Sequence, residues 1–363
     1  MKRPERSLAL DVFRGMTVAF MILVNTPGSW NHVYPPLSHA KWHGYTPTDL
    51  VFPFFLLAVG MSMSFSLKKL EHVSDGEYFR KVIRRSSLIF LIGISLAAFP
   101  FYNTDWENLR IMGVLQRIAL AYLVASVLIR YLEDRHVVIS SFLILAAYWA
   151  LLLAFGGSDP YGLEGNAVLK LDRLILGEGR LWNGLGVPFD PEGLLSTLPA
   201  TVNVLAGYYI GRRVQQSAGR EIVLKLGIIG MALLIAGHAW SLFLPINKSL
   251  WTGSYVLVSV GMGSVVLAVL IHVIDMKACR GWIKPFLVFG MNPLFIYVLS
   301  ILWVSVYYQV IIEGQNTHGW LYDHIFKSIV SPEFGSLLFA LSHVAGCWLV
   351  GLALYKRNIL IKV

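Results

Sequence analysis

Uncharged, apolar runs of about 20 residues recur along the whole chain, and this feature constrains the fold more than any other. A helix of that length crosses the hydrocarbon core of a bilayer, because each residue advances it by about 1.5 Å. Of the 363 residues, 56% are hydrophobic and only 14% are charged, whereas about 25% are charged in an ordinary soluble protein. The sequence therefore excludes a soluble globular enzyme and predicts an all-α, polytopic membrane protein.

Ten membrane-spanning helices are expected from the runs that carry little or no charge. They fall at residues 8–26, 49–67, 82–101, 112–131, 137–155, 193–211, 224–245, 251–274, 285–312 and 334–355. The first run contains Asp11 and Arg14 and lacks a small-residue cleavage pattern, which favours a retained span over a cleaved signal peptide. No segment between the runs is large enough to fold alone, so residues 1–363 are predicted to form a single transmembrane domain.

Positive charges divide unequally between the two sets of connecting segments. With the N-terminus in the cytoplasm, 21 Lys and Arg residues fall in inner segments, seven fall in outer segments and two lie inside helices. Because cytoplasmic loops carry an excess of Lys and Arg, both termini are predicted to be cytoplasmic. The formal net charge of +9 would suggest nucleic acid in a soluble chain, but here it is assigned to membrane orientation, and no nucleic-acid partner is expected.

Three outer segments, at residues 27–48, 156–192 and 313–333, are long and rich in Gly, Pro, Asn and aromatic residues. We expect them to contact whatever the outer face binds. The first, together with the start of the span that follows it, has the highest density of chemically active groups, which are Trp30, His32, His39, Trp42, His43 and Asp49. Its histidines, seven and four residues apart, match no known ligand pattern, so no metal is expected. The alternatives are an interfacial aromatic belt for the tryptophans and a helix N-cap for Asp49.

Polar groups inside the spans are costly unless paired or hydrated, so function is sought there first. Asp11 and Arg14 share one face of the first helix, as an internal ion pair or part of a site. In the fourth helix Gln116 precedes Arg117, whose guanidinium must point away from lipid. In "FGMNPLFIY", Asn292 belongs with Gly290 and Pro293 to a break in the ninth run, and a break at membrane depth requires protein or a polar cavity around it.

Six stretches, in this order, resemble one known family. They are "SLALDVFRGMTVAFMILVN", "HAKWHGYTPTDLVFPFFLLAVGMSMS", "LRIMGVLQRIALAY", "FDPEGLLSTLPATVNVLAGYYIGR", "PINKSLWTGSYVLVSVG" and "FGMNPLFIYV". Together they cover the chain from about residue 7 to 300. The resemblance is to the heparan-α-glucosaminide N-acetyltransferase family, which includes bacterial NagX-like proteins.

The resemblance implies transmembrane acetylation, in which cytoplasmic acetyl-CoA supplies an acetyl group to the amino group of a glucosamine on the far side. It places the catalytic histidine at His39 and its partner asparagine at Asn25. As a base, His39 would take the proton of the amine, while Asn25 would donate to the carbonyl oxygen; an acetyl-imidazole intermediate on His39 is the open alternative. The chain departs from the family in reading Trp-His-Gly at residues 42–44, where Trp-Asn-Gly is frequent, and this bears on the acceptor's identity.

Two further sets of residues are expected to bind the substrates. The acceptor and the pantetheine arm are assigned to Trp42, Asp49, Gln116, Arg117 and Asn292. The coenzyme A phosphates are assigned to inner basic residues, namely Arg14, Arg84, Arg85 and Arg212, and Asp11 beside Arg14 is included in the cofactor-binding set. Asp49 would orient His39 or hold the sugar, Trp42 would stack on the sugar ring, and the arm would pass Arg117 and Asn292 in a pore-like cleft.

The alternative function is a permease for an amino sugar or a related solute, which ten spans and a broken helix would also suit. The outer histidine cluster with Asn25 favours the enzyme, because a permease does not need it. The expected partners are acetyl-CoA, glucosamine or a related amino sugar, and membrane lipid, and a homodimer is the oligomer that the resemblance suggests. The animal enzyme's additional segments are absent from this sequence, which indicates a bacterial inner membrane.

Overall fold

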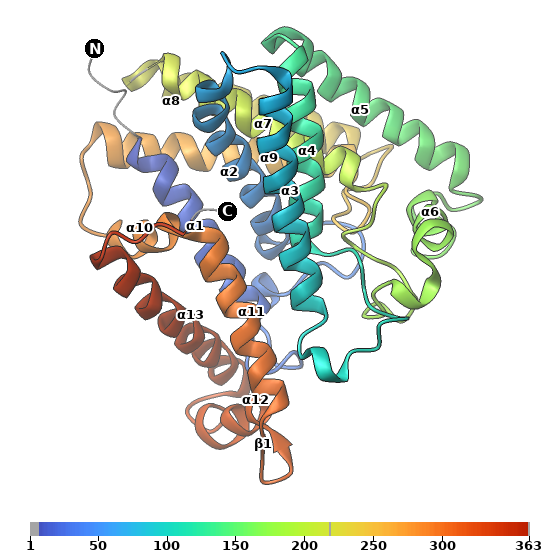
Figure 1. The fold of residues 1–363 in the computed structure, drawn as a ribbon, viewed down its shortest axis with the longest axis vertical. Helices are drawn as coiled ribbons and strands as arrows, with labels where there is room; N and C mark the ends of the chain where they lie inside the picture. Colours follow the sequence, from blue (N-terminus) through green and yellow to red (C-terminus); the bar gives the residue numbers. More distant parts are fainter. Residues whose placement is uncertain (1–6, 218, 362–363) are drawn as a thin grey trace.

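The computed structural model describes residues 7–217 and 219–361, and helices dominate it (Figure 1). In the described ranges the only strands are β1 (Ile311–Ile312) and β2 (Gln315–Asn316), which pair as an antiparallel hairpin. The predicted helical fold class is therefore confirmed. Four basic residues that enter the charge asymmetry lie outside the described residues; they are Lys2, Arg3, Arg6 and Lys362.

Each of the ten predicted spans overlaps a long helix or a helix pair. The long helices are α1 (Leu8–Asn25), α2 (Val51–Ser66), α3 (Asp75–Ala97), α4 (Val114–Tyr131), α5 (Asp134–Phe155), α7 (Thr197–Gln216), α8 (Gly219–Trp240), α9 (Gly253–Leu270), α11 (Pro293–Gln309) and α13 (Pro332–Lys356). The shorter ones are α6 (Ala167–Leu176), α10 (Lys284–Met291) and α12 (Thr317–Leu321). Short 3₁₀ and π turns extend several of them, including η2 (Pro47–Leu50), η3 (Leu67–Leu70) and η6 (Ile271–Met276).

Seven helical segments of the described chain are long and apolar enough to cross a membrane. They are Leu8–Asn25, Pro47–Leu70, Val114–Tyr131, Asp134–Phe155, Gly219–Trp240, Gly253–Met276 and Pro332–Lys356. The pair α10 and α11, bent by 88°, forms an eighth if it is one broken span, and the bend falls at the predicted break. The total of ten and the side of the termini stay predictions.

The helices α3 and α7 both fall outside this criterion, each for a different physical reason. The first half of α3 carries four basic residues, which are Arg80, Lys81, Arg84 and Arg85. In α7 most side chains are buried by other helices, including the polar Thr201 and Asn203. A helix surrounded by protein does not need a lipid-compatible surface, so its low hydropathy is consistent with a central position in the bundle.

Small residues allow the central helices to approach closely. A Cβ atom added at Gly60 of α2 or Gly207 of α7 would overlap a backbone carbonyl of the other helix. The same holds for Gly230 of α8 and Gly261 of α9, whose backbones face each other. Gly15 brings α1 equally close to α10. These contacts fix the relative positions of the helices that carry the site.

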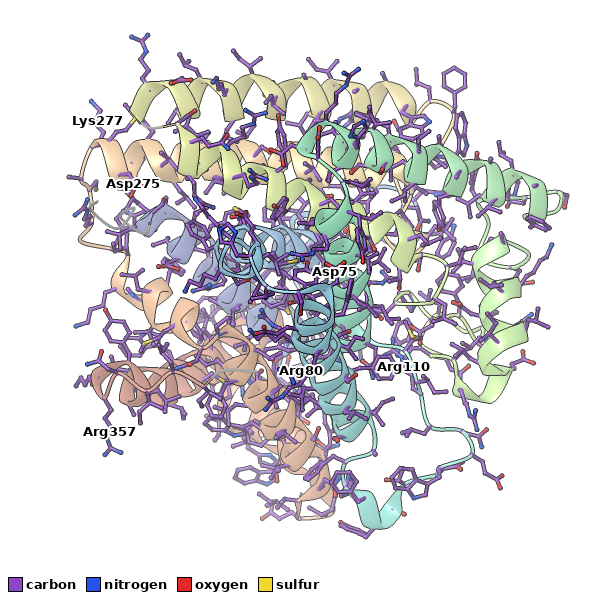
Figure 2. The ribbon with its side chains drawn as sticks, turned by 45° about the horizontal axis from the view of Figure 1, so that its top comes forward. Asp75, Arg80, Arg110, Asp275, Lys277 and Arg357 are labelled. Atoms are coloured by element: carbon purple, nitrogen blue, oxygen red, sulfur yellow. The ribbon has the colours of Figure 1, made fainter. Side chains whose placement is uncertain are left out.

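The two ends of the bundle differ in the segments they display. The α1 helix has 18 residues, so its ends lie about 26 Å apart. At the end marked by Asn25, the loop after α1 meets the segments before α4, before α7 and before α9, which together line one cavity. Figure 2 shows Arg110 of this region far from Asp275 and Lys277, which lie at the opposite end of the molecule.

Candidate active site

The loop after α1 is held in place by Asp49, the third residue of the short helix η2. One carboxylate oxygen of Asp49 accepts the backbone N–H of Thr46 at 3.0 Å and that of Ala40 at 3.0 Å, and it also contacts the Thr46 hydroxyl at 3.2 Å. The Thr46 hydroxyl donates to the carbonyl of Ser38 at 2.6 Å. Asp49 thus acts in capping, as one sequence interpretation expected, and it also folds the residues around position 39 back against the helix.

The second oxygen of Asp49 lies 2.6 Å from Nδ1 of His39. The Asp49 side chain is only 1% exposed, whereas the His39 side chain is 40% exposed. An ionised carboxylate oxygen can only accept a hydrogen bond, so Nδ1 carries a hydrogen, and in the neutral ring the lone pair is then on Nε2. Asp49 is therefore placed where it can orient the His39 ring, with Nε2 on the side away from the carboxylate.

Lys248, in the connection between α8 and α9, is the third member of this cluster. Its Nζ lies 3.0 Å from Nδ1 of His39 and 3.4 Å from Oδ1 of Asp49. Burial lowers the pKa of Lys248, and the carboxylates of Asp49 and Glu192 oppose this shift. The amine therefore shares the Asp49 carboxylate with the imidazole, and it balances the charge of a buried acid.

An arginine–carboxylate network forms another wall of the same cavity. Arg110 donates through Nε and Nη2 to the two oxygens of Asp190, both at 2.8 Å, and also to Glu192 at 2.7 Å. Burial alone would raise the pKa of Glu192, but Arg110 and Arg117 lower it overall. The bidentate geometry fixes the acidic segment against the segment that precedes α4.

Aromatic side chains complete the lining. Trp42 donates its indole N–H to the carbonyl of Tyr161 at 2.8 Å, and its ring meets Phe189 edge-on at 5.4 Å between centroids. Trp182 lies under the guanidinium of Arg110, at 5.9 Å from the ring centroid. Trp42 and Trp182 are thus anchored to protein, whereas Trp30, which also lines the cavity, is 60% exposed and remains compatible with an interfacial belt.

These groups surround one cavity of about 610 Å³. Asn25, the last residue of α1, lines it together with His39, Trp42 and Asp49. The Asn25 side chain is exposed, so its amide is available to a molecule in the cavity. The structure therefore brings together four residues that the sequence analysis assigned to catalysis and acceptor binding.

Gln116 and Arg117 are buried and do not belong to the lining of this cavity. Arg117 is fully buried, donates to the hydroxyl of Ser196 and to the carbonyl of Gly193, and packs 4.7 Å from the ring centroid of Trp251. Its Nε and Nη1 atoms find no hydrogen-bond partner within the described ranges. In this state Arg117 supports the segment that carries Glu192.

Asn292 lies at the bend between α10 and α11, away from the cavity. Its amide donates to the carbonyl of Ile359 at 2.8 Å and accepts the N–H of Ile361 at 2.8 Å. The polar groups at the helix break are therefore satisfied by the C-terminal segment of the same chain. This is the protein environment that a break at membrane depth requires.

The residues expected to hold the coenzyme A phosphates are spread over three helices. Arg14 of α1 pairs with Asp11 at 3.0 Å, as one interpretation expected, and contacts Ser62 and the carbonyl of Gly290. On α3, Arg84 is exposed and Arg85 packs 5.0 Å from the ring centroid of Tyr122. On α7, Arg212 pairs with Asp134 at 2.9 Å. The structure does not gather the five in one pocket.

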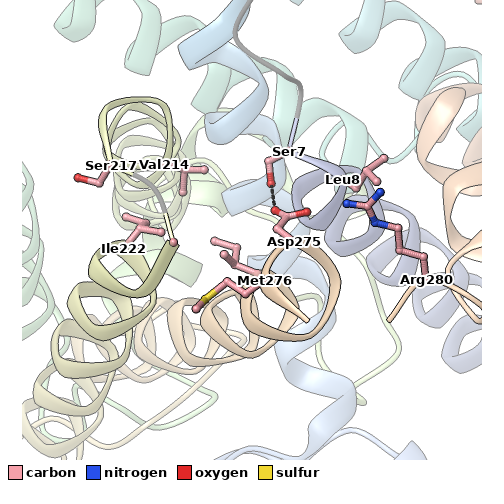
Figure 3. Close-up of a pocket in the computed structure, with 10 residues that line it drawn as sticks. Ser7, Leu8, Val214, Ser217, Ile222, Asp275, Met276 and Arg280 are labelled. Carbon is pink, nitrogen blue, oxygen red and sulfur yellow. Dashed lines mark hydrogen bonds between the residues drawn. The ribbon is translucent and has the colours of Figure 1, made fainter. Parts of the chain in front are cut away.

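A second cavity, of about 540 Å³, opens at the other end of α1 (Figure 3). Ser7 donates to Asp275 at 2.8 Å within it, and Arg280 lies on the other side of Asp275. The residues that were predicted to hold coenzyme A do not line this second cavity. It also shares no lining residue with the cavity around His39. The two cavities mark opposite ends of the bundle and do not by themselves form the expected continuous cleft.

Sequence reasoning did not assign Arg110, Trp182, Glu192 and Lys248 to the site. Three of them lie within motifs that carried the family resemblance, which read "LRIMG", "FDPEG" and "PINKS". Each of these outer motifs contains a charged residue, and that was the signal that could have identified Arg110, Glu192 and Lys248. Within the described ranges, no group of three or more His, Cys, Asp and Glu side chains is arranged to hold a metal ion.

A known protein family matches the part of the chain that contains most of this site. The family model described as heparan-alpha-glucosaminide N-acetyltransferase, catalytic, matches residues 6–244. The chain belongs to this family. The matched region contains His39, Asp49, Arg110 and Glu192, while Lys248 follows four residues after its end.

Two relatives in this family extend the similarity to nearly the whole chain. The human heparan-alpha-glucosaminide N-acetyltransferase is 28% identical over 92% of this chain and 58% of its own length. The mouse protein of that name is 27% identical over 99% of this chain and 61% of its own length. The chain thus spans about three fifths of these relatives. The family match and the apolar helices together identify an integral membrane protein.

Proposed function

We propose that this protein is a transmembrane N-acetyltransferase that transfers the acetyl group of acetyl-CoA to the amino group of a glucosamine-type sugar bound beside His39. The observation that carries the proposal is the His39–Asp49 pair in a polar cavity that also contains Asn25. The family membership supports the reaction class, because both relatives bear the name of an N-acetyltransferase acting on glucosaminide.

His39 is the proposed general base. The acceptor must attack as a neutral amine, and Asp49 holds the imidazole so that Nε2 can accept a proton. As the amine nitrogen bonds to the thioester carbon, its proton passes to His39. The carbon–sulfur bond then breaks, and the leaving thiolate takes that proton to become free coenzyme A.

Asn25 is the proposed donor to the carbonyl oxygen, where negative charge grows during the attack. Loss of one such donor typically lowers the rate by about 100-fold or more. In a two-step route, Nε2 of His39 would first attack the thioester, and the amine would then resolve the acetyl-imidazole. Acetylation of the protein by donor alone, detected by intact mass, distinguishes this route from direct transfer.

The acceptor is expected to be a sugar because of what lines the cavity. Arg110, Glu192 and Lys248 offer charged hydrogen-bond partners for hydroxyl and amino groups, and Trp42 and Trp182 offer flat apolar faces. This combination of a few polar groups with aromatic walls is typical of small-molecule sites. We place the acceptor between these walls, with its amine toward His39.

The donor and acceptor are proposed to approach from opposite sides of a bacterial inner membrane. The predicted excess of basic residues puts the Asn25 end of α1 on the periplasmic side and the Ser7 end on the cytoplasmic side. Arg14 and Arg212 near the cytoplasmic end remain our proposals for the coenzyme A phosphates. In this proposal, a passage between the two cavities opens when the donor binds.

The decisive experiment supplies the purified full-length protein with acetyl-CoA and glucosamine. Thiol release and N-acetylglucosamine formation are measured together, and both are expected in equal amounts. The His39→Ala variant should lose at least 100-fold in kcat while coenzyme A still binds. His32→Ala is the matched control, because His32 lies in the same loop but outside the cavity lining. Absence of product from wild type, or full activity of His39→Ala, contradicts the proposal.

The helix break at Asn292 had suggested a permease as the alternative function, but the contacts of Asn292 give this alternative little support. Both polar contacts of Asn292 at the bend go to the C-terminal segment of the chain, and the residue does not line either of the two cavities described above. Uptake of intact labelled glucosamine into proteoliposomes, without acetylation, would instead favour the permease.

A further inference from the structure

A third cavity is a long groove on the membrane-facing side of the bundle, remote from the His39 site. Its walls come from α5 and α8, and its floor comes from α7 and α9; Figure 1 shows these four helices together along the upper part of the molecule. The volume is about 520 Å³, within the range of about 300–1,000 Å³ that suits one small ligand. The groove is thus large enough for one extended chain.

The lining is almost entirely apolar along the groove. On α5 it includes Phe142, and on α8 it includes Ile229, which are 57% and 44% exposed. Side chains of this kind on the outer helices of an integral membrane protein face lipid, because water would leave a large apolar surface exposed. The groove therefore opens to the hydrocarbon region.

The length of the groove matches one leaflet of a bilayer. On α7 the lining runs from Val202 to Arg213, and on α8 it runs from Ile222 to Leu233. Each stretch advances eleven residues, or about 16 Å. Half of the hydrocarbon core is about 15 Å thick. An acyl chain that starts at the basic end would reach the middle of the membrane.

Among the described residues that line the groove, the only charged side chains are two cations at the same end. Arg213 lies in the last turn of α7, and Lys225 lies in the second turn of α8. The Arg213 guanidinium lies 4.7 Å from the ring centroid of Tyr209, and among the described residues no ion pair of Arg213 is found. Lys225 is partly neutralised by Glu221 at 2.5 Å, so Arg213 supplies most of the positive charge.

We propose that this groove binds one anionic phospholipid, with an acyl chain along α7 and α9 and the phosphate at Arg213 and Lys225. Apolar length, one-leaflet depth and cations confined to the leaflet surface together fit a lipid with a negatively charged headgroup. A second copy of this chain would need a complementary anion at the basic end, whereas the phospholipid brings both parts in one molecule.

Lipid binding is tested on the full-length protein in detergent by native mass spectrometry. Phosphatidylglycerol and phosphatidylcholine with identical acyl chains are titrated separately. Wild type should bind one phosphatidylglycerol at least roughly fivefold more tightly than phosphatidylcholine, because one basic side chain at a membrane surface contributes about that factor. Arg213→Gln should remove this preference, and Ala206→Phe, which fills the groove, should weaken binding of both lipids.

Arg357→Gln is the matched control, because Arg357 follows α13 and lies far from the groove (Figure 2). It should behave as wild type. Equal binding of the two lipids to wild type, or equal losses in Arg213→Gln and Arg357→Gln, would overturn the proposal. A dimer that Ala206→Phe dissociates, with lipid binding unchanged, would also overturn it and assign the groove to a second copy. None of these readouts depends on acetyl transfer.

Discussion

Replacement of Asp49 by asparagine isolates the orientation of His39 from the folding of its loop. One oxygen of Asp49 makes the contacts to Ala40 and Thr46, and the other faces His39 and Lys248. An asparagine can keep its carbonyl oxygen on the first set and turn its NH₂ group toward the second. The loop contacts are then retained, and only the partner of the imidazole changes.

The expected effect follows from the change in hydrogen-bond direction. An NH₂ group donates, so it selects the tautomer of His39 with the hydrogen on Nε2, which cannot accept the proton of the amine. In serine hydrolases the equivalent change lowers kcat by about 10,000-fold. Because His39 is 40% exposed and can still rotate, we expect a loss of about 100- to 1,000-fold, or about 3–4 kcal/mol of activation free energy.

The assay measures kcat by thiol release at saturating glucosamine, together with the KM for acetyl-CoA and the melting temperature. The KM for acetyl-CoA should stay within about twofold, since Asp49 lies on the acceptor side. Asp105→Asn is the control, because Asp105 is exposed in an outer connection and does not line the cavity. A kcat of Asp49→Asn within threefold of wild type, in a folded protein, would refute the orienting role.

Two further predictions concern stability. Burial raises the pKa of Asp172 from 3.8 to about 7, so between these values the folded protein binds a proton that the unfolded chain does not. The free energy of unfolding of the wild type should therefore fall as pH rises through this window. Asp172→Asn should remove this fall and gain up to about 4 kcal/mol of stability at pH 8, measured by thermal melts in detergent. A pH dependence that is the same in Asp172→Asn as in wild type would contradict this prediction. Gly60→Ala should lose about 1–3 kcal/mol because its Cβ overlaps the Val204 carbonyl, whereas Gly227→Ala, which meets no atom within 4 Å, should melt as wild type does.

Local patterns were enough to predict that several of these residues lie close together. Asn25, His39, Trp42 and Asp49 lie at the end of one helix and in the loop that follows, so their proximity depends on few intervening residues. The helix break at Asn292 was also predictable, because proline and glycine act on the backbone at their own positions. The proposal of a common donor pocket relied instead on the positive-inside bias, which assigns residues to a side of the membrane and to no particular cavity.

What the sequence alone determined is the helical membrane fold and the loop that carries His39, because hydropathy and turn chemistry act over short stretches of chain. Tertiary structure alone decided that Arg110 reaches Asp190 and Glu192, and that Lys248 reaches His39. These contacts join residues about 80 to 209 positions apart. They depend on how α2, α4, α7 and α9 pack at their glycines and polar side chains, and no pattern within one segment encodes that packing.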